Sequence, residues 1–290
     1  MGSGSYTASD WDKLRGSRKI TTSSNERELF TTNKFLDKFN PKFIDKRESR
    51  DNDEHPNSTP IAIGLDVTGS MGYLPTEIIK NGLNELMKKL YSSQVIPDPQ
   101  LMFAAIGDVH DDAPLQVTQF ESDIRIAEQL LELWIEGQGG DIPEDYSLLW
   151  YFLAKHTDTD SMKKRNKKGY AFTIGDAPNH ASLFDNDIKA IFNDDSKTLS
   201  KNEIITMCQE KYNLFHIDIG HYGDHNDVVS CKTIRIDKSQ VDLIPEIIIT
   251  VICRIEGVDS SEILGHLDKK TLDIIDNSLK YVQFDEVINF

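Results

Sequence analysis

The stretch that most constrains the fold is residues 60–72, which read PIAIGLDVTGSMG. Its first six residues form an apolar run that is too short for a helix and is typical of a buried β-strand. The run ends at the carboxylate of Asp66, and two hydroxyl residues, Thr68 and Ser70, follow at alternate positions of a glycine-containing loop. Three hard oxygen donors on one tight loop predict a site for Mg²⁺, Mn²⁺ or Ca²⁺ rather than for Zn²⁺.

The chain beyond this loop alternates short apolar runs with amphipathic segments. The apolar runs predict strands at residues 60–65, 101–106, 114–120, 170–174 and 214–219, and the amphipathic segments predict helices at 75–91, 122–134, 144–156, 200–211 and 241–256. This alternation predicts an α/β fold, Rossmann-like and doubly wound, with a mainly parallel central sheet and helices on both faces. Ligands of such sheets bind at the carboxyl ends of the strands, where the strand order reverses.

The two ends of the chain differ from this central part. Residues 1–57 predict a polar N-terminal arm with short helices, whose aromatic side chains dock on the main domain or on a partner. Within the arm, residues 44–59 carry too many charges for a core and are interpreted as a linker or surface segment. Residues 58–256 form the predicted main domain. Residues 257–290 form a C-terminal extension with predicted helices at 261–267 and 272–282, and the basic run 163–168 predicts a solvated loop.

Composition narrows the classes of function. The chain has 290 residues and a net charge of −16, which disfavours nucleic acid as a partner because nucleic-acid binding requires a basic surface. The three cysteines are widely spaced and odd in number, which indicates reduced thiols. The first residues show no secretory signal, and no run reaches the ~18 apolar residues of a membrane span. We therefore expect a cytoplasmic protein without membrane partners.

The run DVTGS at residues 66–70 resembles the metal-ion-dependent adhesion site of von Willebrand factor type A domains, and the chain looks like an intracellular prokaryotic or phage-type member. The first motif of that family is Asp-x-Ser/Thr-x-Ser at the end of the first strand. Two further loops follow in the family's order, GGDIPE at 139–144 and GDAP at 175–178. The resemblance implies that Asp176 is the last acidic ligand, usually bound through water. It also implies that Asp141 stands where many members carry a threonine.

The ligand set implied by the resemblance is therefore Asp66, Thr68, Ser70, Asp141 and Asp176, holding Mg²⁺ or, alternatively, Mn²⁺ or Ca²⁺. The function implied is non-catalytic: the cation keeps a coordination place for an Asp or Glu of a protein partner, such as an ATPase of the AAA+ class or another multi-protein complex. Glu144 is expected to begin the next helix, where a carboxylate is favoured by the helix dipole.

Two other functions stay open. Asp108 and His110 form an Asp-x-His run, and together with Asp176 and His180 they resemble parts of calcineurin-like metallophosphoesterases, which activate water with two metals. Against this, that family begins with Asp-x-His on its first strand, and His180 lies only four residues beyond Asp176. Taken singly, Asp108 is expected at a surface turn, the loop histidines in solvent and His216 in the core. The third possibility is a structural subunit whose metal only stabilises the fold.

Overall fold

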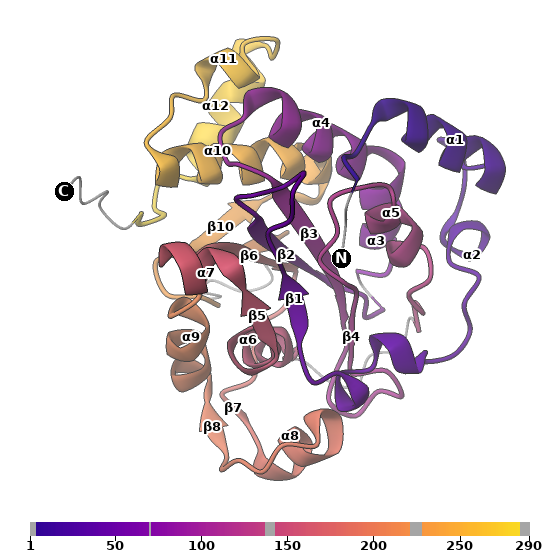
Figure 1. Ribbon diagram of the computed structural model, residues 1–290, viewed down its shortest axis with the longest axis vertical. Coiled ribbons are helices and arrows are strands. Elements are labelled where there is room, and N and C mark those ends of the chain that lie inside the picture. Colours follow the sequence, from indigo (N-terminus) through magenta and orange to yellow (C-terminus); the bar gives the residue numbers. More distant parts are fainter. Residues whose placement is uncertain (1–3, 70, 137–142, 221–227, 285–290) are drawn as a thin grey trace.

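The computed structural model describes residues 4–69, 71–136, 143–220 and 228–284, and its centre is a six-stranded sheet (Figure 1). The strand order is β10 (Thr233–Ile236), β9 (Tyr212–Ile219), β6 (Gly169–Gly175), β2 (Thr59–Asp66), β3 (Pro99–Ile106) and β4 (Leu115–Val117). All neighbouring pairs are parallel except β3 and β4. The chain thus adds β3 and β4 on one side of β2. It then crosses to the other side of β2, where it adds β6, β9 and β10. The point where the strand order reverses lies between β2 and β6.

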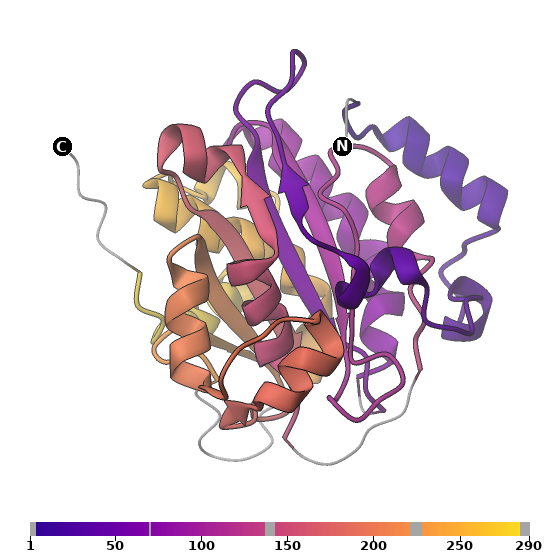
Figure 2. The same cartoon turned by 60° about the horizontal axis from the view of Figure 1, so that its bottom comes forward.

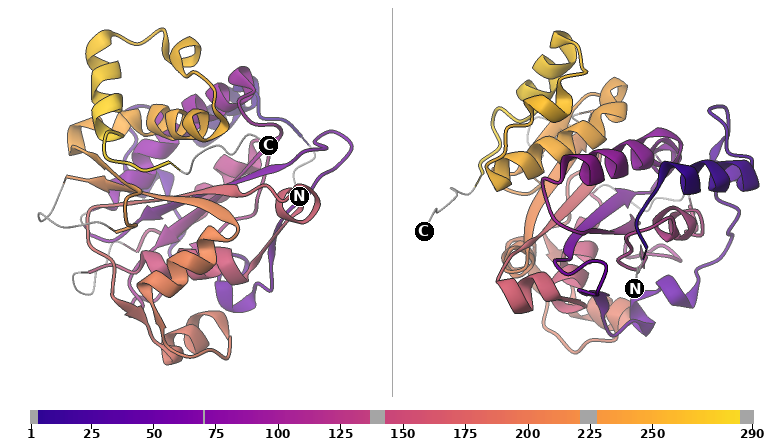
Figure 3. Two further views of the ribbon diagram at one scale, coloured as in Figure 1. Left: turned by 90° about the vertical axis from the view of Figure 1, so that its left-hand side faces the viewer. Right: turned by 45° about the horizontal axis from the view of Figure 1, so that its top comes forward.

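Helices cover both faces of this sheet, which confirms the predicted α/β fold class (Figure 3). The helices α4 (Leu83–Ser93) and α10 (Ile244–Glu256) contact each other in one layer, and α6 (Tyr146–Lys155) and α9 (Lys201–Gln209) contact each other in the other. Successive side chains of β2 enter different hydrophobic clusters: Ile61 and Ile63 pack with the α4 layer and Ala62 with the α6 layer. This is the result expected for a strand buried on both faces.

The remaining elements lie around these three layers. They are α1 (Ala8–Arg18), α2 (Glu26–Leu29), β1 (Arg47–Ser49), α3 (Tyr73–Glu77), α5 (Arg125–Leu130), β5 (Thr157–Thr159), α7 (Asp160–Arg165), β7 (Ser182–Leu183), α8 (Asp185–Phe192), β8 (Leu199–Ser200), α11 (Ser261–Leu264) and α12 (Lys269–Ser278). A π-helical turn, Ile78–Gly82, joins α3 to α4, and 3₁₀ helices form at Asp37–Phe39, at Pro41–Phe43 and, before α10, at Lys238–Leu243. No helix among the described residues is long and apolar enough to cross a membrane.

Four of the six aromatic residues of the N-terminal arm, Tyr6, Trp11, Phe30 and Phe39, pack into the core of the same chain. Trp11 and Phe39 are each 2% exposed and belong to the hydrophobic cluster that contains α4 and α10. The hydroxyl of Tyr6 donates a hydrogen bond of 3.0 Å to Asn84 Oδ1 on α4. In the views of Figures 1 and 2, α1 lies beside α4 on the side away from α10 and α12.

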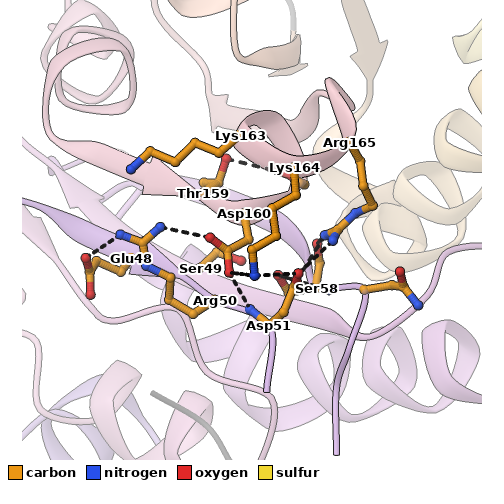
Figure 4. A network of polar contacts seen from close by, with 12 residues as sticks. Glu48, Ser49, Arg50, Asp51, Ser58, Thr159, Asp160, Lys163, Lys164 and Arg165 are labelled. Carbon is orange, nitrogen blue, oxygen red and sulfur yellow. Dashed lines mark hydrogen bonds and ion pairs between the residues drawn. The ribbon is translucent and has the colours of Figure 1, made fainter. Parts of the chain in front are cut away.

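Of the two interpretations of the charged segment 44–59, a linker or a surface segment, the structure supports the surface segment. Its residues Arg47–Ser49 form β1, which pairs in parallel with β5. The charges are paired: Arg50 contacts Glu48, Asp158 and Asp160, and Asp51 accepts from Arg165 and Lys164 (Figure 4). Because Glu48, Arg50 and Asp51 meet opposite charges, this part of the segment can lie against the body of the protein.

Several other boundaries also differ from the predictions. The basic run expected as a loop at 163–168 begins as the last turn of α7, which ends at Arg165 and is capped by Asn166 in a left-handed conformation (φ 50°). The helix expected from 241 starts as an α-helix only at Ile244, after the 3₁₀ turn. The sequence did not predict the strands β1, β5, β7, β8 and β10 or the helices α7 and α8.

Candidate metal centre

Two of the predicted ligands end the two strands that flank the reversal of strand order. Asp66 is the last residue of β2, and Asp176 follows directly after β6. The strands pair in parallel with Leu65 opposite Ile174, so both carboxylates lie at the same rim of the sheet. Asp66 is fully buried and Asp176 is 5% exposed. This rim is the general location of ligand sites in sheets of this topology.

The carboxylate of Asp66 is held in one orientation by three donors. Its Oδ1 accepts from the backbone N of Thr68 at 2.9 Å and from Thr68 Oγ1 at 2.7 Å. Its Oδ2 accepts from the hydroxyl of Tyr146, the first residue of α6, at 3.1 Å. Gly175 makes this approach possible, because a Cβ there would collide with the Tyr146 hydroxyl and come within 2.8 Å of Asp66 Oδ2. The lack of a side chain at Gly175 therefore shapes the site.

Glu144 belongs to this site, although we expected it to begin a helix. The helix α6 begins two residues later, and the Glu144 side chain turns inward, with its Oε1 3.0 Å from Thr68 Oγ1. Its other oxygen, Oε2, is buried and has no hydrogen-bond partner among the described residues. The loop is held in this position by a backbone hydrogen bond of 2.8 Å from Glu144 N to Pro178 O.

The electrostatics of these carboxyl groups favour the binding of a positive charge at this rim. Burial raises the pKa of Asp66 to about 6, and the charge of Asp176 adds to the rise. Burial raises the pKa of Glu144 to about 8, with a further contribution from Asp66. The single hydroxyl proton of Thr68 cannot be donated to both Asp66 and Glu144. A divalent cation would compensate the charges and accept the unpaired oxygen of Glu144, so the described residues fit a metal ion.

Three further residues bear on this rim: the predicted ligands Ser70 and Asp141, and Lys238 beside Asp176. Ser70 and Asp141 lie outside the described residues. Asp176 has a cation nearby, since Lys238 Nζ lies 3.4 Å from its Oδ2.

The residues of the rival phosphoesterase prediction are brought together in part. Asp108 is buried and not at a surface turn, contrary to expectation, and His180 Nε2 lies 3.7 Å from its Oδ2. The third member of this cluster is Asp145, which was not predicted. His110 is exposed and contributes only its backbone N, which donates to Asp108 Oδ1 at 2.8 Å.

Within the described ranges, Asp108, Asp145 and His180 are the only group of three histidine, cysteine or acidic side chains with ligand atoms all within 4.8 Å of one another. Asp66, Glu144 and Asp176 are spread more widely than this. Such a spread is compatible with the water-mediated contact that the resemblance implies for Asp176.

Comparisons with known proteins give weak matches of structure alone. No family model and no curated protein matches the sequence. Proximal thread matrix protein 1 of the mussel byssus is 10% identical in two structures, both with TM-score 0.44. One covers 70% of this chain and 48% of that chain; the other, with a zinc-occupied MIDAS motif, covers 66% and 47%.

The pilus adhesin SpaC of Lactobacillus rhamnosus GG in its open conformation is also 10% identical, with TM-score 0.37, and the match covers 80% of this chain and 31% of that chain. This chain therefore spans less than half the length of each of these proteins. At such TM-scores the likenesses assign neither family nor function. The fold class rests on the strand order, and the site rests on its own residues.

Proposed function

We propose that this chain is a non-catalytic, metal-dependent protein-binding domain of the von Willebrand factor A type. The observation that carries the proposal is the pair of buried carboxylates, Asp66 and Asp176, at the ends of the two strands where the strand order reverses. Asp66, Thr68, Ser70, Asp141 and Asp176 are the proposed ligands, and Mg²⁺ is the proposed ion. All five offer hard oxygen donors, which suits Mg²⁺, Mn²⁺ or Ca²⁺.

Glu144, in the loop before α6, also supports this proposal. Its carboxyl group lies against the Thr68 hydroxyl and has an oxygen without a hydrogen-bond partner among the described residues, so it is available to the same ion. When bound, the cation would supply a positive charge and a coordination place for a carboxylate from another protein. The partner is then a protein with an accessible Asp or Glu, such as a cytoplasmic ATPase of the AAA+ class.

The hydroxyl of Thr68 is better suited to ligation than to nucleophilic attack. It is buried, and its oxygen lies within hydrogen-bond distance of two carboxyl groups. Its one proton can be donated to only one of them, and the lone pairs of its oxygen remain for the proposed ion.

The test is affinity capture from native lysate with the full chain as bait, in Mg²⁺ and in EDTA. We expect a partner that is retained in Mg²⁺, released by EDTA and absent with Asp66→Asn. The matched control is Asp112→Asn, which removes the same charge from an exposed residue between β3 and β4. The control should retain the partner, because Asp112 is not one of the proposed ligands.

The alternatives predict different results. A structural metal would raise the melting temperature while capture stays the same in Mg²⁺, in EDTA and with Asp66→Asn. A phosphoesterase would hydrolyse a phosphodiester such as bis(p-nitrophenyl) phosphate with Mn²⁺ and lose this turnover in Asp108→Asn. Either result would contradict the binding function proposed here.

A further inference from the structure

We propose that Asp108, Asp145 and His180 form a second metal site, separate from the rim site of Asp66, which takes Zn²⁺. The three residues come from the loop after β3, the loop before α6 and the loop after β6. One ligand atom of each lies within 4.8 Å of the other two. The inference concerns cation binding alone and does not depend on the protein partner proposed above.

Two polar atoms in this cluster face each other without a hydrogen bond. Asp108 is fully buried, and its Oδ2 has no hydrogen-bond partner among residues 4–69, 71–136, 143–220 and 228–284. The same is true of His180 Nε2, which lies 3.7 Å away, beyond hydrogen-bonding distance. Buried polar atoms are rarely left unpaired, because each loses its bonds to water. A cation between Asp108 Oδ2 and His180 Nε2 would coordinate both atoms.

The separation of these atoms suits a shared metal ion. Two ligands on a tetrahedral Zn²⁺ with bonds of about 2.1 Å lie roughly 3.4 Å apart. The observed 3.7 Å therefore needs only a small adjustment. A direct ion pair without metal would instead be expected to close to hydrogen-bonding distance.

The ligands are also held in position by the backbone around them. Asp145 Oδ2 accepts from Val109 N at 3.0 Å, and Asp108 Oδ1 accepts from His110 N at 2.8 Å. The backbone N of His180 donates to Glu144 O at 3.0 Å, which ties the His180 loop to the Asp145 loop. Bonds of this kind orient metal ligands before the ion binds.

The donor set explains why the ion should differ from that of the rim. One imidazole nitrogen and two carboxylate oxygens match Zn²⁺, whereas Mg²⁺ and Ca²⁺ prefer oxygen alone. The charges also balance, because two carboxylates neutralise one dication. Three protein ligands leave a fourth tetrahedral position for water. The chain would thus hold two neighbouring ions of different chemistry.

The experiment uses the full chain after removal of metals, with Mg²⁺ in large excess to occupy the rim site. Zn²⁺ is titrated by calorimetry, and bound zinc is counted by elemental analysis after dialysis. We expect one Zn²⁺ per chain. Asp108→Asn and His180→Ala should each weaken Zn²⁺ binding at least ten-fold. The matched control for His180→Ala is His110→Ala, because His110 is an exposed histidine of the neighbouring loop, and this variant should bind Zn²⁺ as the wild type does.

The variant Asp66→Asn tests whether the two sites are independent. It removes a ligand of the rim site only and should still bind Zn²⁺. The inference fails if no Zn²⁺ binds, if His180→Ala and Asp108→Asn bind it as the wild type does, or if Asp66→Asn abolishes it. Co²⁺ gives a second readout in the folded variants, because loss of the imidazole ligand changes its visible absorption. Failure here leaves the partner-capture test intact, since that test depends on Asp66.

Discussion

At the scale of single residues, His216 shows how burial alone sets a pH dependence. It lies in β9, is fully buried, and its Nδ1 is 3.0 Å from Thr173 Oγ1. Its ring packs on that of Tyr146, with the centroids 4.6 Å apart. Burial lowers the pKa of His216 to about 3. The core position predicted for it is confirmed, although only one of its ring nitrogens is hydrogen-bonded among the described residues.

The consequence is acid destabilisation with a defined sign. Below the unfolded histidine pKa of about 6.5, the unfolded chain binds a proton that the folded chain does not bind, so stability falls as pH falls. The slope from this group approaches about 1.4 kcal/mol per pH unit. In His216→Asn, the loss of unfolding free energy between pH 7 and pH 5 should shrink by up to about 2 kcal/mol.

Urea denaturation at several pH values measures this change. His266→Asn is the matched control, because His266 is exposed. It should keep the wild-type dependence on pH. An unaltered dependence in His216→Asn would show that the buried imidazole is not the group responsible.

The residues of the rim could be predicted only where they are local in sequence. Asp66 and Thr68 stand on one loop, and Asp176 follows its own apolar run, so the sequence shows each of them directly. Glu144 and Asp145 were missed because an acidic pair before a helix is also typical of a helix start. Their inward orientation depends on the pairing of their loop with residues 178–180, which no local pattern indicates.

At the scale of elements, the central strands were predictable and the peripheral ones were not. The strands β2, β3, β6 and β9 are continuous apolar runs, because helices cover both of their faces. The strand β10 has only four residues, one of them the exposed Arg235, and offers too short a pattern. The strand β1 is short and is followed by Arg50 and Asp51, whose charges indicate solvent until their partners on β5 and α7 are known.

The ion pairs around β1 predict a measurable cost for Arg50→Met. Arg50 lies 2.7 Å from Asp158 and 3.0 Å from Asp160, and hydrogen bonds from Arg50 lower the pKa of Asp158 to about 2. Its side chain is only 23% exposed, so the network lies between an exposed pair and a buried one. We expect a loss of about 1–2 kcal/mol in unfolding free energy.

Urea denaturation measures the loss, and amide hydrogen exchange of residues 47–49 locates it. Lys38→Met is the control, because Lys38 and its partner Glu132 are 53% and 38% exposed and such pairs contribute little. Equal stability of Arg50→Met and Lys38→Met would mean that the network does not attach β1 to the body of the protein.

At the scale of the whole molecule, the rim lies where the two halves of the sheet meet. Asp66 ends the first strand of one half, Asp176 follows the first strand of the other, and Glu144 lies in the crossover between the halves. An ion at this rim would therefore connect segments that are far apart in sequence. Metal binding should stabilise the entire fold and not one loop alone, because no such site exists in the unfolded chain.

Mg²⁺ added to the metal-free chain should accordingly raise the melting temperature. At a concentration one hundred times its Kd, a bound ion adds about 2.7 kcal/mol of stability. For a chain of 290 residues that corresponds to a rise of roughly 4–5 °C. Differential scanning calorimetry measures it, and Asp66→Asn should lose most of the rise while Asp112→Asn keeps it.

The charge of the chain makes ionic strength the essential control for this experiment. The chain has a net charge of −16, so its negative side chains repel one another in the folded protein, and any salt screens part of that repulsion. NaCl at the same ionic strength should therefore raise the melting temperature of wild type and Asp66→Asn by the same small amount. Only the additional rise in Mg²⁺ is due to a site. If Asp66→Asn gains as much from Mg²⁺ as the wild type does, the ion acts on the surface charge and not at the rim.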